Sequence, residues 1–123
     1  MNHLEYDPKQ SGLNAVLKPW QLKAMQVVWS SPEGANSRTV WVKVNQMLQT
    51  ETISRASIIN FLEAMRIMKV LGGVEETGKG GHHWVYSPAM DESEFKKFIA
   101  NTLLSSLMKS FPEETKGAIN RLN

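Results

Sequence analysis

The chain has 123 residues, 41% of them hydrophobic, which predicts one globular domain with room for an appendage. The absence of cysteine excludes disulfides, thiolate metal sites and cysteine nucleophiles. No apolar run reaches the roughly 20 residues that cross a bilayer, and residues 1–12 lack a signal-peptide core, so we expect a cytoplasmic protein without a membrane partner. The net charge is only +2. The excess of basic over acidic side chains lies in residues 37–90, which contain six basic and four acidic residues. This distribution suits contacts with phosphate groups.

The first 36 residues predict an arm, a helix and a loop. We expect residues 1–14 to form a flexible or loosely docked N-terminal arm. A helix should begin at Pro19, because the first helical turn does not need the N–H that proline lacks. Its apolar face would carry Leu22, Met25, Val28 and Trp29. The sequence SSPEG at 30–34 predicts the loop that ends this helix.

A second helix is expected to begin at a cap formed by Asn36 or Ser37 and to continue through Leu48. The run VWVKV at 40–44 is rich in β-branched residues and would also suit a short strand. We favour the helix because apolar residues continue at helical spacing past this run, with Asn45 on the polar side.

A third helix is expected from a cap at Ser54 to about Val70, where Gly72 and Gly73 would stop it. The inner face carries four apolar residues at helical spacing: Ile58, Phe61, Leu62 and Met65. On or near the outer face we expect Arg55, Ala56, Ile59, Asn60, Glu63 and Arg66.

Two short strands should follow this helix, at 74–77 and 82–86, joined by a glycine-rich turn at 78–81. A helix followed directly by a β-hairpin is the order of a winged helix-turn-helix domain, which we assign to residues 15–90. The predicted fold is therefore mainly α with a small β-hairpin.

The C-terminal segment, 91–123, is expected to be helical. Asp91 and Glu94 form a capping-box pattern at its start, and a short last helix should run from about Glu113 to Leu122. The first of these helices has a wide apolar face, which favours a homodimer interface. The alternative is that it folds back on its own domain. The expected interface residues are Phe95, Phe98, Ile99, Leu103, Leu107 and Phe111.

The outer face of the third helix suits the major groove of DNA, where short polar side chains and arginine reach base edges. Arg55 can donate two hydrogen bonds to guanine, Asn60 can pair with adenine and Ile59 can contact a thymine methyl group. We expect base contacts from these three residues and from Ser57. The alternative is a solvated helix face with Ile59 packed on a neighbour.

Phosphate contacts are expected from Ser37, Arg38, Ser54, Lys79 and His82. The glycines around Lys79 permit close approach to a phosphate, although an ordinary hairpin turn would look the same. Successive strand residues such as His82 and His83 point to opposite faces. No cysteine or suitably spaced acid completes a ligand shell, so we expect no metal site and no cofactor.

Three stretches have a characteristic order: LKPWQLKAMQVVW at 17–29, ANSRTV at 35–40 with Arg38, and the third helix followed by WVYSP at 84–88. They resemble the opening helix, the second-helix entry, and the recognition helix with wing exit of the penicillinase-repressor family. This family of winged-helix regulators includes methicillin-resistance and copper-responsive repressors. The resemblance implies a homodimeric DNA-binding repressor paired through its C-terminal helices.

The chain also departs from that family. Lys69 stands where the family usually has glycine, and neither a C-terminal cysteine motif nor a counterpart of the proteolytic induction site is found. Copper and antibiotic sensing are therefore not implied. Regulators of the multiple-antibiotic-resistance type share the architecture and stay an alternative family.

These observations predict a sequence-specific DNA-binding transcriptional regulator, by resemblance a repressor, that acts as a homodimer. The third helix would enter the major groove and the wing would contact the backbone. The alternative is a winged-helix adaptor that binds proteins and not DNA. We do not expect an enzyme, because no nucleophile has an evident base, no phosphate-binding loop occurs and no paired acids have an obvious role. The sequence does not identify an effector.

Overall fold

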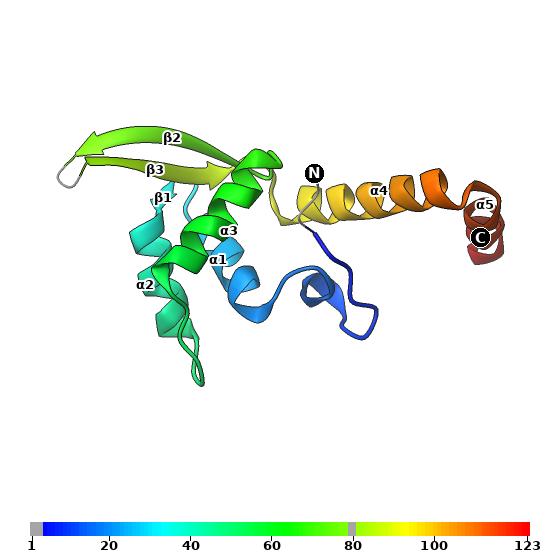
Figure 1. Cartoon of the computed structure of the whole chain (residues 1–123), viewed down its shortest axis with the longest axis horizontal. Helices are drawn as coiled ribbons and strands as arrows, with labels where there is room; N and C mark the ends of the chain where they lie inside the picture. The colour runs from blue at the N-terminus through cyan, green and yellow to red at the C-terminus, as the bar shows by residue number, and fades with distance from the viewer. Residues whose placement is uncertain (1–3, 79–80) are drawn as a thin grey trace. The chain divides into compact units, whose positions relative to one another are not determined.

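The computed structural model describes residues 4–78 and 81–123, apart from the side chain of His82. The chain is mainly helical with a small three-stranded antiparallel sheet, and it divides into two compact units at Asp91 (Figure 1). The first unit contains a 3-10 helix η1 (Gly12–Ala15), α1 (Pro19–Trp29), β1 (Ala35–Asn36), α2 (Ser37–Met47), α3 (Arg55–Ile67), β2 (Leu71–Gly78) and β3 (Gly81–Pro88). The second unit contains α4 (Glu92–Ser110) and α5 (Pro112–Leu122).

The helices of the first unit begin where their capping residues predict. α1 starts at Pro19. The side chain of Asn36 accepts a hydrogen bond from the Thr39 amide at 2.8 Å and caps α2. The Ser54 hydroxyl accepts one from the Ser57 amide at 3.1 Å and caps α3. The helix expected near 36–48 is confirmed over the strand alternative, because a satisfied cap and helical spacing outweigh the β-branched run.

The end of α3 differs from the prediction. α3 ends at Ile67, and the chain reverses through Lys69, which has a left-handed φ of 66°. The amides of Lys69 and Val70 donate to carbonyls of the last helical turn at 3.0 and 2.9 Å, which is a Schellman end. The expectation that Gly72 and Gly73 stop the helix is wrong, since both lie in β2.

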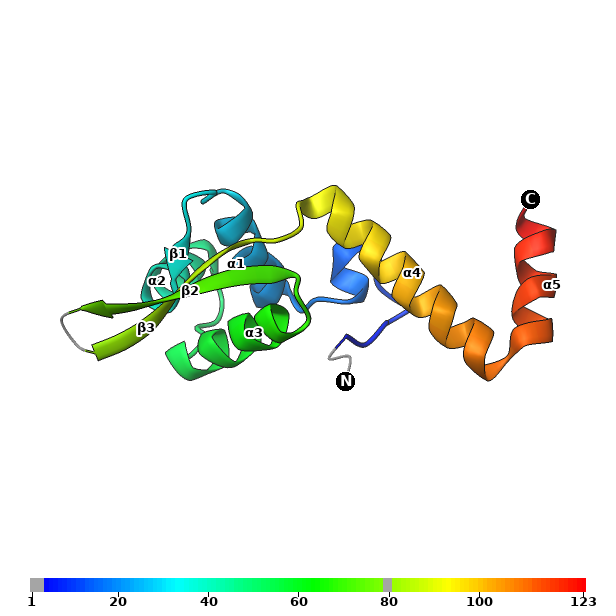
Figure 2. The same cartoon turned by 90° about the horizontal axis from the view of Figure 1, so that it is seen from above.

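The sheet has the order β1-β3-β2, with both pairs antiparallel. β2 and β3 pair from Leu71 with Pro88 to Gly78 with Gly81, so the expected hairpin is present with strands longer than predicted. In Figure 2 this hairpin extends past α2 and α3. The two-residue strand β1 pairs with Val85 and Tyr86 and was not expected.

The core of the first unit lies where α1, α2 and α3 pack together beneath the sheet. All four residues expected on the inner face of α3 are buried. They join buried apolar side chains from the other elements, including Met25, Val28, Val40, Val44, Val70, Leu71 and Tyr86. The Trp29 indole N–H donates to the Met90 carbonyl at 2.9 Å and so fixes the segment that follows β3.

The segment before α1 is folded over part of its length. The Asp7 amide donates to the Ala15 carbonyl at 2.7 Å, which closes a loop around η1. Ala15 and Leu17 are buried. This segment therefore contributes apolar side chains to the first unit.

In the second unit α5 turns away from the axis of α4 (Figure 2). The Thr115 hydroxyl is buried and donates to the Leu107 carbonyl at 3.1 Å, which joins the two helices across Pro112. Within the described parts of the chain, no helix combines the length and hydropathy of a membrane span.

Candidate nucleic-acid interface

The N-terminal half of α3 presents an exposed, mixed surface. Arg55, Ala56, Ile59 and Asn60 are exposed, with Ile59 at 36% of its full accessible area. Positions three to four residues apart share one side of a helix, so these side chains form one face. Ser57 differs, because it is half-buried and its hydroxyl accepts a 2.9 Å hydrogen bond from Ser54. Both serines therefore serve the helix cap.

The connection between α2 and α3 is held by Asn45. Its amide group donates to the carbonyls of Trp41 and Ile53 at 3.0 and 3.1 Å, and its oxygen accepts from the Ile53 amide at 2.8 Å. The Trp41 indole N–H also donates to the Ile53 carbonyl at 2.9 Å. Sequence reasoning placed Asn45 on a polar face and missed this role. The clamp fixes where α3 begins relative to α2.

The second half of α3 holds the hairpin. The Glu63 carboxylate accepts from the Tyr86 hydroxyl at 2.6 Å and from the Arg66 guanidinium at 3.0 and 3.1 Å. The Arg66 guanidinium lies 4.2 Å from the centre of the Trp84 ring. Glu63 and Arg66, expected on or near the outer face, are half-buried and tie α3 to β3.

This contact shifts the protonation of two groups. The hydrogen bond from Arg66 is the main reason that the pKa of Glu63 lies below its ordinary value. Burial, followed by the hydrogen bond to the charged Glu63 carboxylate, raises the pKa of the Tyr86 phenol. Glu63 is therefore ionised and Tyr86 neutral at pH 7, as a phenol-to-carboxylate hydrogen bond requires.

The outer part of the hairpin is less basic than a wing that contacts DNA along its length. Glu75, Glu76 and the apolar Val74 are exposed on β2. Lys79 and the side chain of His82, both expected at phosphates, lie outside the described residues. The described part of β2 therefore exposes acidic and apolar side chains.

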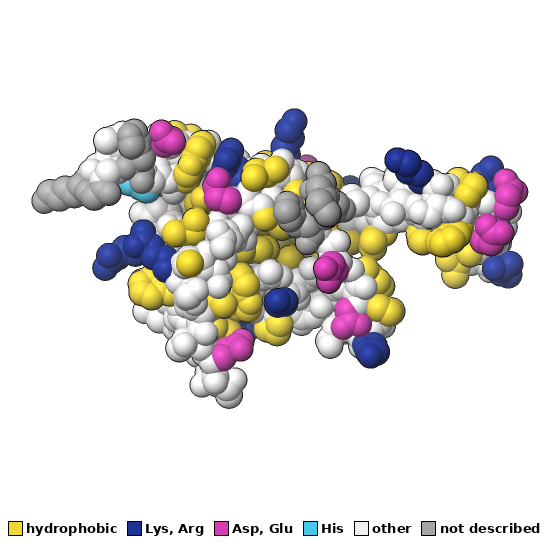
Figure 3. Space-filling view, viewed as in Figure 1, with side chains coloured by type: hydrophobic (Ala, Val, Ile, Leu, Met, Phe, Trp, Pro, Cys, Tyr) yellow, Lys and Arg dark blue, Asp and Glu magenta, His cyan; other side chains and the backbone are white. Residues whose placement is uncertain are grey.

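The start of α2 supplies one exposed cation. Arg38 is exposed, whereas Ser37 retains only 8% of its accessible area. We therefore leave Ser37 out of the candidate surface, since its side chain has little access to a phosphate. In Figure 3 one patch of basic side chains protrudes below the hairpin, and other basic side chains are scattered over the same face. No group of three metal-ligating side chains occurs in the described part of the chain.

The apolar face of the second unit is only partly available to a partner. Phe95 and Ile99 are buried in the single chain, and Phe98 and Leu103 are half-buried. The homodimer interface expected from Phe95, Phe98, Ile99, Leu103, Leu107 and Phe111 stays a prediction, to which Phe95 and Ile99 contribute little exposed area. Exposed apolar residues toward the end of α4 and just after it are Leu104, Leu107 at 48% and Phe111 at 57%, and Leu122 is exposed at the end of α5.

The site is therefore built on α3, which has a capped start and an exposed N-terminal face. The Asn45 hydrogen bonds fix the connection before this helix, and the Glu63–Tyr86 contact ties its second half to the hairpin. Comparison of the chain with protein-family models, with curated proteins and with solved structures found no match.

Proposed function

We propose that the protein is a sequence-specific DNA-binding regulator that reads the major groove with α3. The observation that carries this proposal is the exposed face of Arg55, Ile59 and Asn60 on a helix fixed at both ends. The Asn45 clamp holds its start and the Glu63–Tyr86 contact holds its second half. A recognition helix needs this combination of exposed side chains on a rigid element.

The three side chains have complementary roles in this proposal. The Arg55 guanidinium would donate two hydrogen bonds to the O6 and N7 of guanine. The Asn60 amide would pair with adenine one turn later, and Ile59 would contact the methyl group of thymine. Arg38, on the exposed start of α2, would bind a phosphate and set the position of α3 in the groove.

We further infer a winged helix-turn-helix domain that works as a homodimer. The element order α1-β1-α2-α3-β2-β3 and the antiparallel sheet support this assignment. The resemblance of residues 17–29, 35–40 and 84–88 to the penicillinase-repressor family supports repression as its outcome. The dimer surface would be the exposed apolar residues near the end of α4, where Leu104, Leu107 and Phe111 lie.

Binding to random duplex DNA at rising salt concentration tests the DNA-binding part of the proposal. Each neutralised phosphate releases a counterion, so affinity should fall linearly on a double-logarithmic plot with a slope of about −0.9 per phosphate contact. A matched variant, Arg38→Ala, should flatten that slope by about one unit. Absence of duplex binding at about 50 mM salt by a folded chain would refute the proposal.

The second candidate is a protein-binding adaptor. It is favoured by the exposed apolar side chains of Ile67, at the end of α3, and Val74, on β2, and by Glu75 and Glu76, which follow Val74 in the chain. An adaptor would show no steep loss of duplex affinity with salt, and the same titration therefore separates the two functions.

A further inference from the structure

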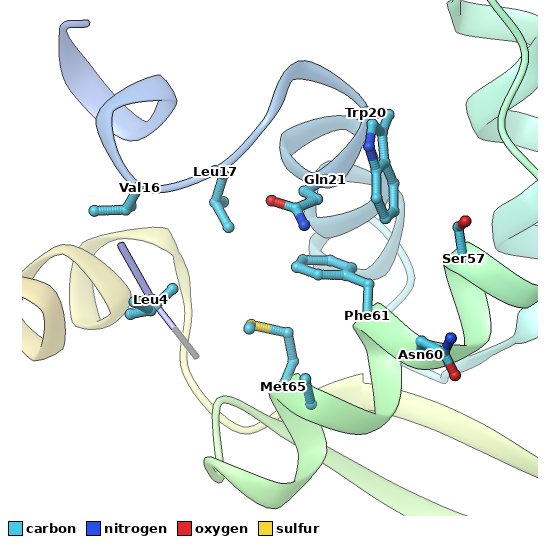
Figure 4. A pocket seen from close by; sticks show the side chains of 10 residues that line it. Leu4, Val16, Leu17, Trp20, Gln21, Ser57, Asn60, Phe61 and Met65 are labelled. Atoms are coloured by element: carbon cyan, nitrogen blue, oxygen red, sulfur yellow. The ribbon is translucent and has the colours of Figure 1, made fainter. Parts of the chain in front are cut away.

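A cavity of about 310 Å³ lies in the first unit between the N-terminal segment, α1 and α3 (Figure 4). Its wall is mainly apolar and aromatic. The rings of Trp20 from α1 and Phe61 from α3 meet edge to face, with centroids 5.6 Å apart. Leu4, Leu17 and Met65 also line it. This volume is at the lower end of small-molecule sites, which hold roughly 300–1,000 Å³.

The polar groups of the cavity specify a kind of ligand. The side-chain oxygen of Gln21 already accepts a 2.9 Å hydrogen bond from the Lys18 amide. The NH2 group of Gln21, beside the Phe61 ring in Figure 4, is then the part of this amide left to donate to a guest. No described residue that lines the cavity is charged. The lining therefore offers no counter-charge for the hydration that an ionic guest would lose against the apolar wall, which favours a neutral guest.

The cavity shares a wall with the proposed DNA-reading surface. Ser57 and Asn60 of α3 line its rim, and Phe61 follows Asn60 directly. A guest seated against Phe61 would also contact Ser57 and Asn60, since all three residues line the same cavity. Because base recognition depends on placing Arg55 and Asn60 within hydrogen-bond reach, a small shift of this helix alters DNA affinity.

We propose that this cavity binds a small neutral aromatic molecule that carries a hydrogen-bond acceptor, and that its occupation changes DNA binding by α3. The second part rests on the proposed function, whereas the first does not. The ring would lie among Trp20, Phe61 and Met65, and the acceptor would receive a hydrogen bond from the Gln21 amide nitrogen.

Fluorine NMR on the full chain tests the binding site with three probes. 4-Fluorobenzamide is neutral and has an acceptor, fluorobenzene lacks the acceptor, and 4-fluorobenzoate is charged. We expect the amide to bind at least about tenfold more tightly than either of the others, as one desolvated hydrogen bond would give. Binding of the benzoate as tight as that of the amide, or no binding of the amide at millimolar concentration, would overturn the proposal.

Two pairs of variants locate the probe. Gln21→Glu keeps an acceptor for the Lys18 amide but removes the donor, and Gln26→Glu adds the same charge on the exposed side of α1. Ala64→Leu fills the cavity, and Ala100→Leu makes the same change on exposed α4. We expect the amide affinity to fall at least about tenfold in Gln21→Glu and Ala64→Leu only. Unchanged binding in Ala64→Leu would place the probe elsewhere and refute the site.

DNA affinity measured with and without saturating 4-fluorobenzamide tests the coupling. We expect a change of at least about threefold in the unmodified chain and none in Ala64→Leu. Unchanged DNA affinity with the probe bound would refute the coupling and leave the binding site intact. If the chain binds no DNA with or without 4-fluorobenzamide, the proposed function is refuted, while binding of 4-fluorobenzamide in the cavity stands or falls by the fluorine NMR result.

Discussion

Arg55 is the residue at which base reading is tested most sharply, because it is exposed and is the first residue of α3. We expect Arg55→Ala to cost about 1–3 kcal/mol of binding free energy on the preferred DNA site and to relax specificity at one base pair. Competition binding with single-base-pair variants of the site measures this loss. Arg38→Ala is the matched control and should weaken all sequences alike. An equal loss on all sequences for Arg55→Ala would contradict its role at a base.

Glu63 couples the stability of the fold to pH. Its pKa is lowered chiefly by the hydrogen bond from Arg66, so its stabilisation is complete above the ordinary carboxyl value of 4.5. That stabilisation disappears as the pH falls through the lower folded-state pKa. We expect Glu63→Gln to reduce the free energy of unfolding by about 1–3 kcal/mol at neutral pH, with a smaller difference at about pH 3.

Urea unfolding of both proteins at several pH values measures this difference. Glu113→Gln serves as a control, because Glu113 faces Lys116 at 3.8 Å on an exposed surface and should matter little. A difference between Glu63→Gln and the unmodified chain that stays constant into acid would show that the carboxylate charge contributes nothing.

At the scale of elements, the packing of β2 leaves less space for a side chain at Gly73 than at the adjacent Gly72. A Cβ on Gly73 would lie 2.9 Å from Cδ of Arg66 and 3.0 Å from the Trp84 ring, whereas the nearest atom to one on Gly72 is 3.5 Å away. We expect Gly73→Ala to destabilise the fold by about 1–3 kcal/mol and Gly72→Ala by less than about 1 kcal/mol. Urea unfolding compares them, and equal losses would contradict the contact.

The sequence predicted helices better than strands, for a physical reason. Caps and apolar spacing are local, so Pro19, Asn36 and Ser54 mark the helix starts correctly. β1 exists because two residues pair with Val85 and Tyr86 far along the chain, which no local pattern encodes. The reversal at Lys69 was missed because lysine has no preference for a left-handed conformation.

In the candidate site, too, local patterns predict some features, whereas contacts between residues far apart in the chain determine others. The outward position of Arg55, Ile59 and Asn60 follows from helical periodicity, and all three residues are exposed. Glu63 also appeared outward by that periodicity, but the Tyr86 hydroxyl from β3 lies against it. Such tertiary contacts decide which polar residues bind partners and which hold elements together.

At the scale of the whole molecule, the proposed homodimer depends on the apolar residues at the end of α4. Leu107→Asp places a charge on that surface, and Ser106→Asp places one on the exposed neighbouring position. We expect Leu107→Asp to weaken self-association at least about tenfold, because burying an unpaired charge is costly, and Ser106→Asp to change it little. Sedimentation velocity over a range of concentrations checks both variants, and a monomeric unmodified chain would contradict the dimer.

The central claim is that α3 reads DNA sequence in a two-fold symmetric assembly. Selection of bound duplexes from a random DNA pool tests it most directly. We predict enrichment of a palindrome whose half-sites lie about one helical turn, or about 10 base pairs, apart. A folded protein that enriches no sequence over repeated rounds would contradict the claim.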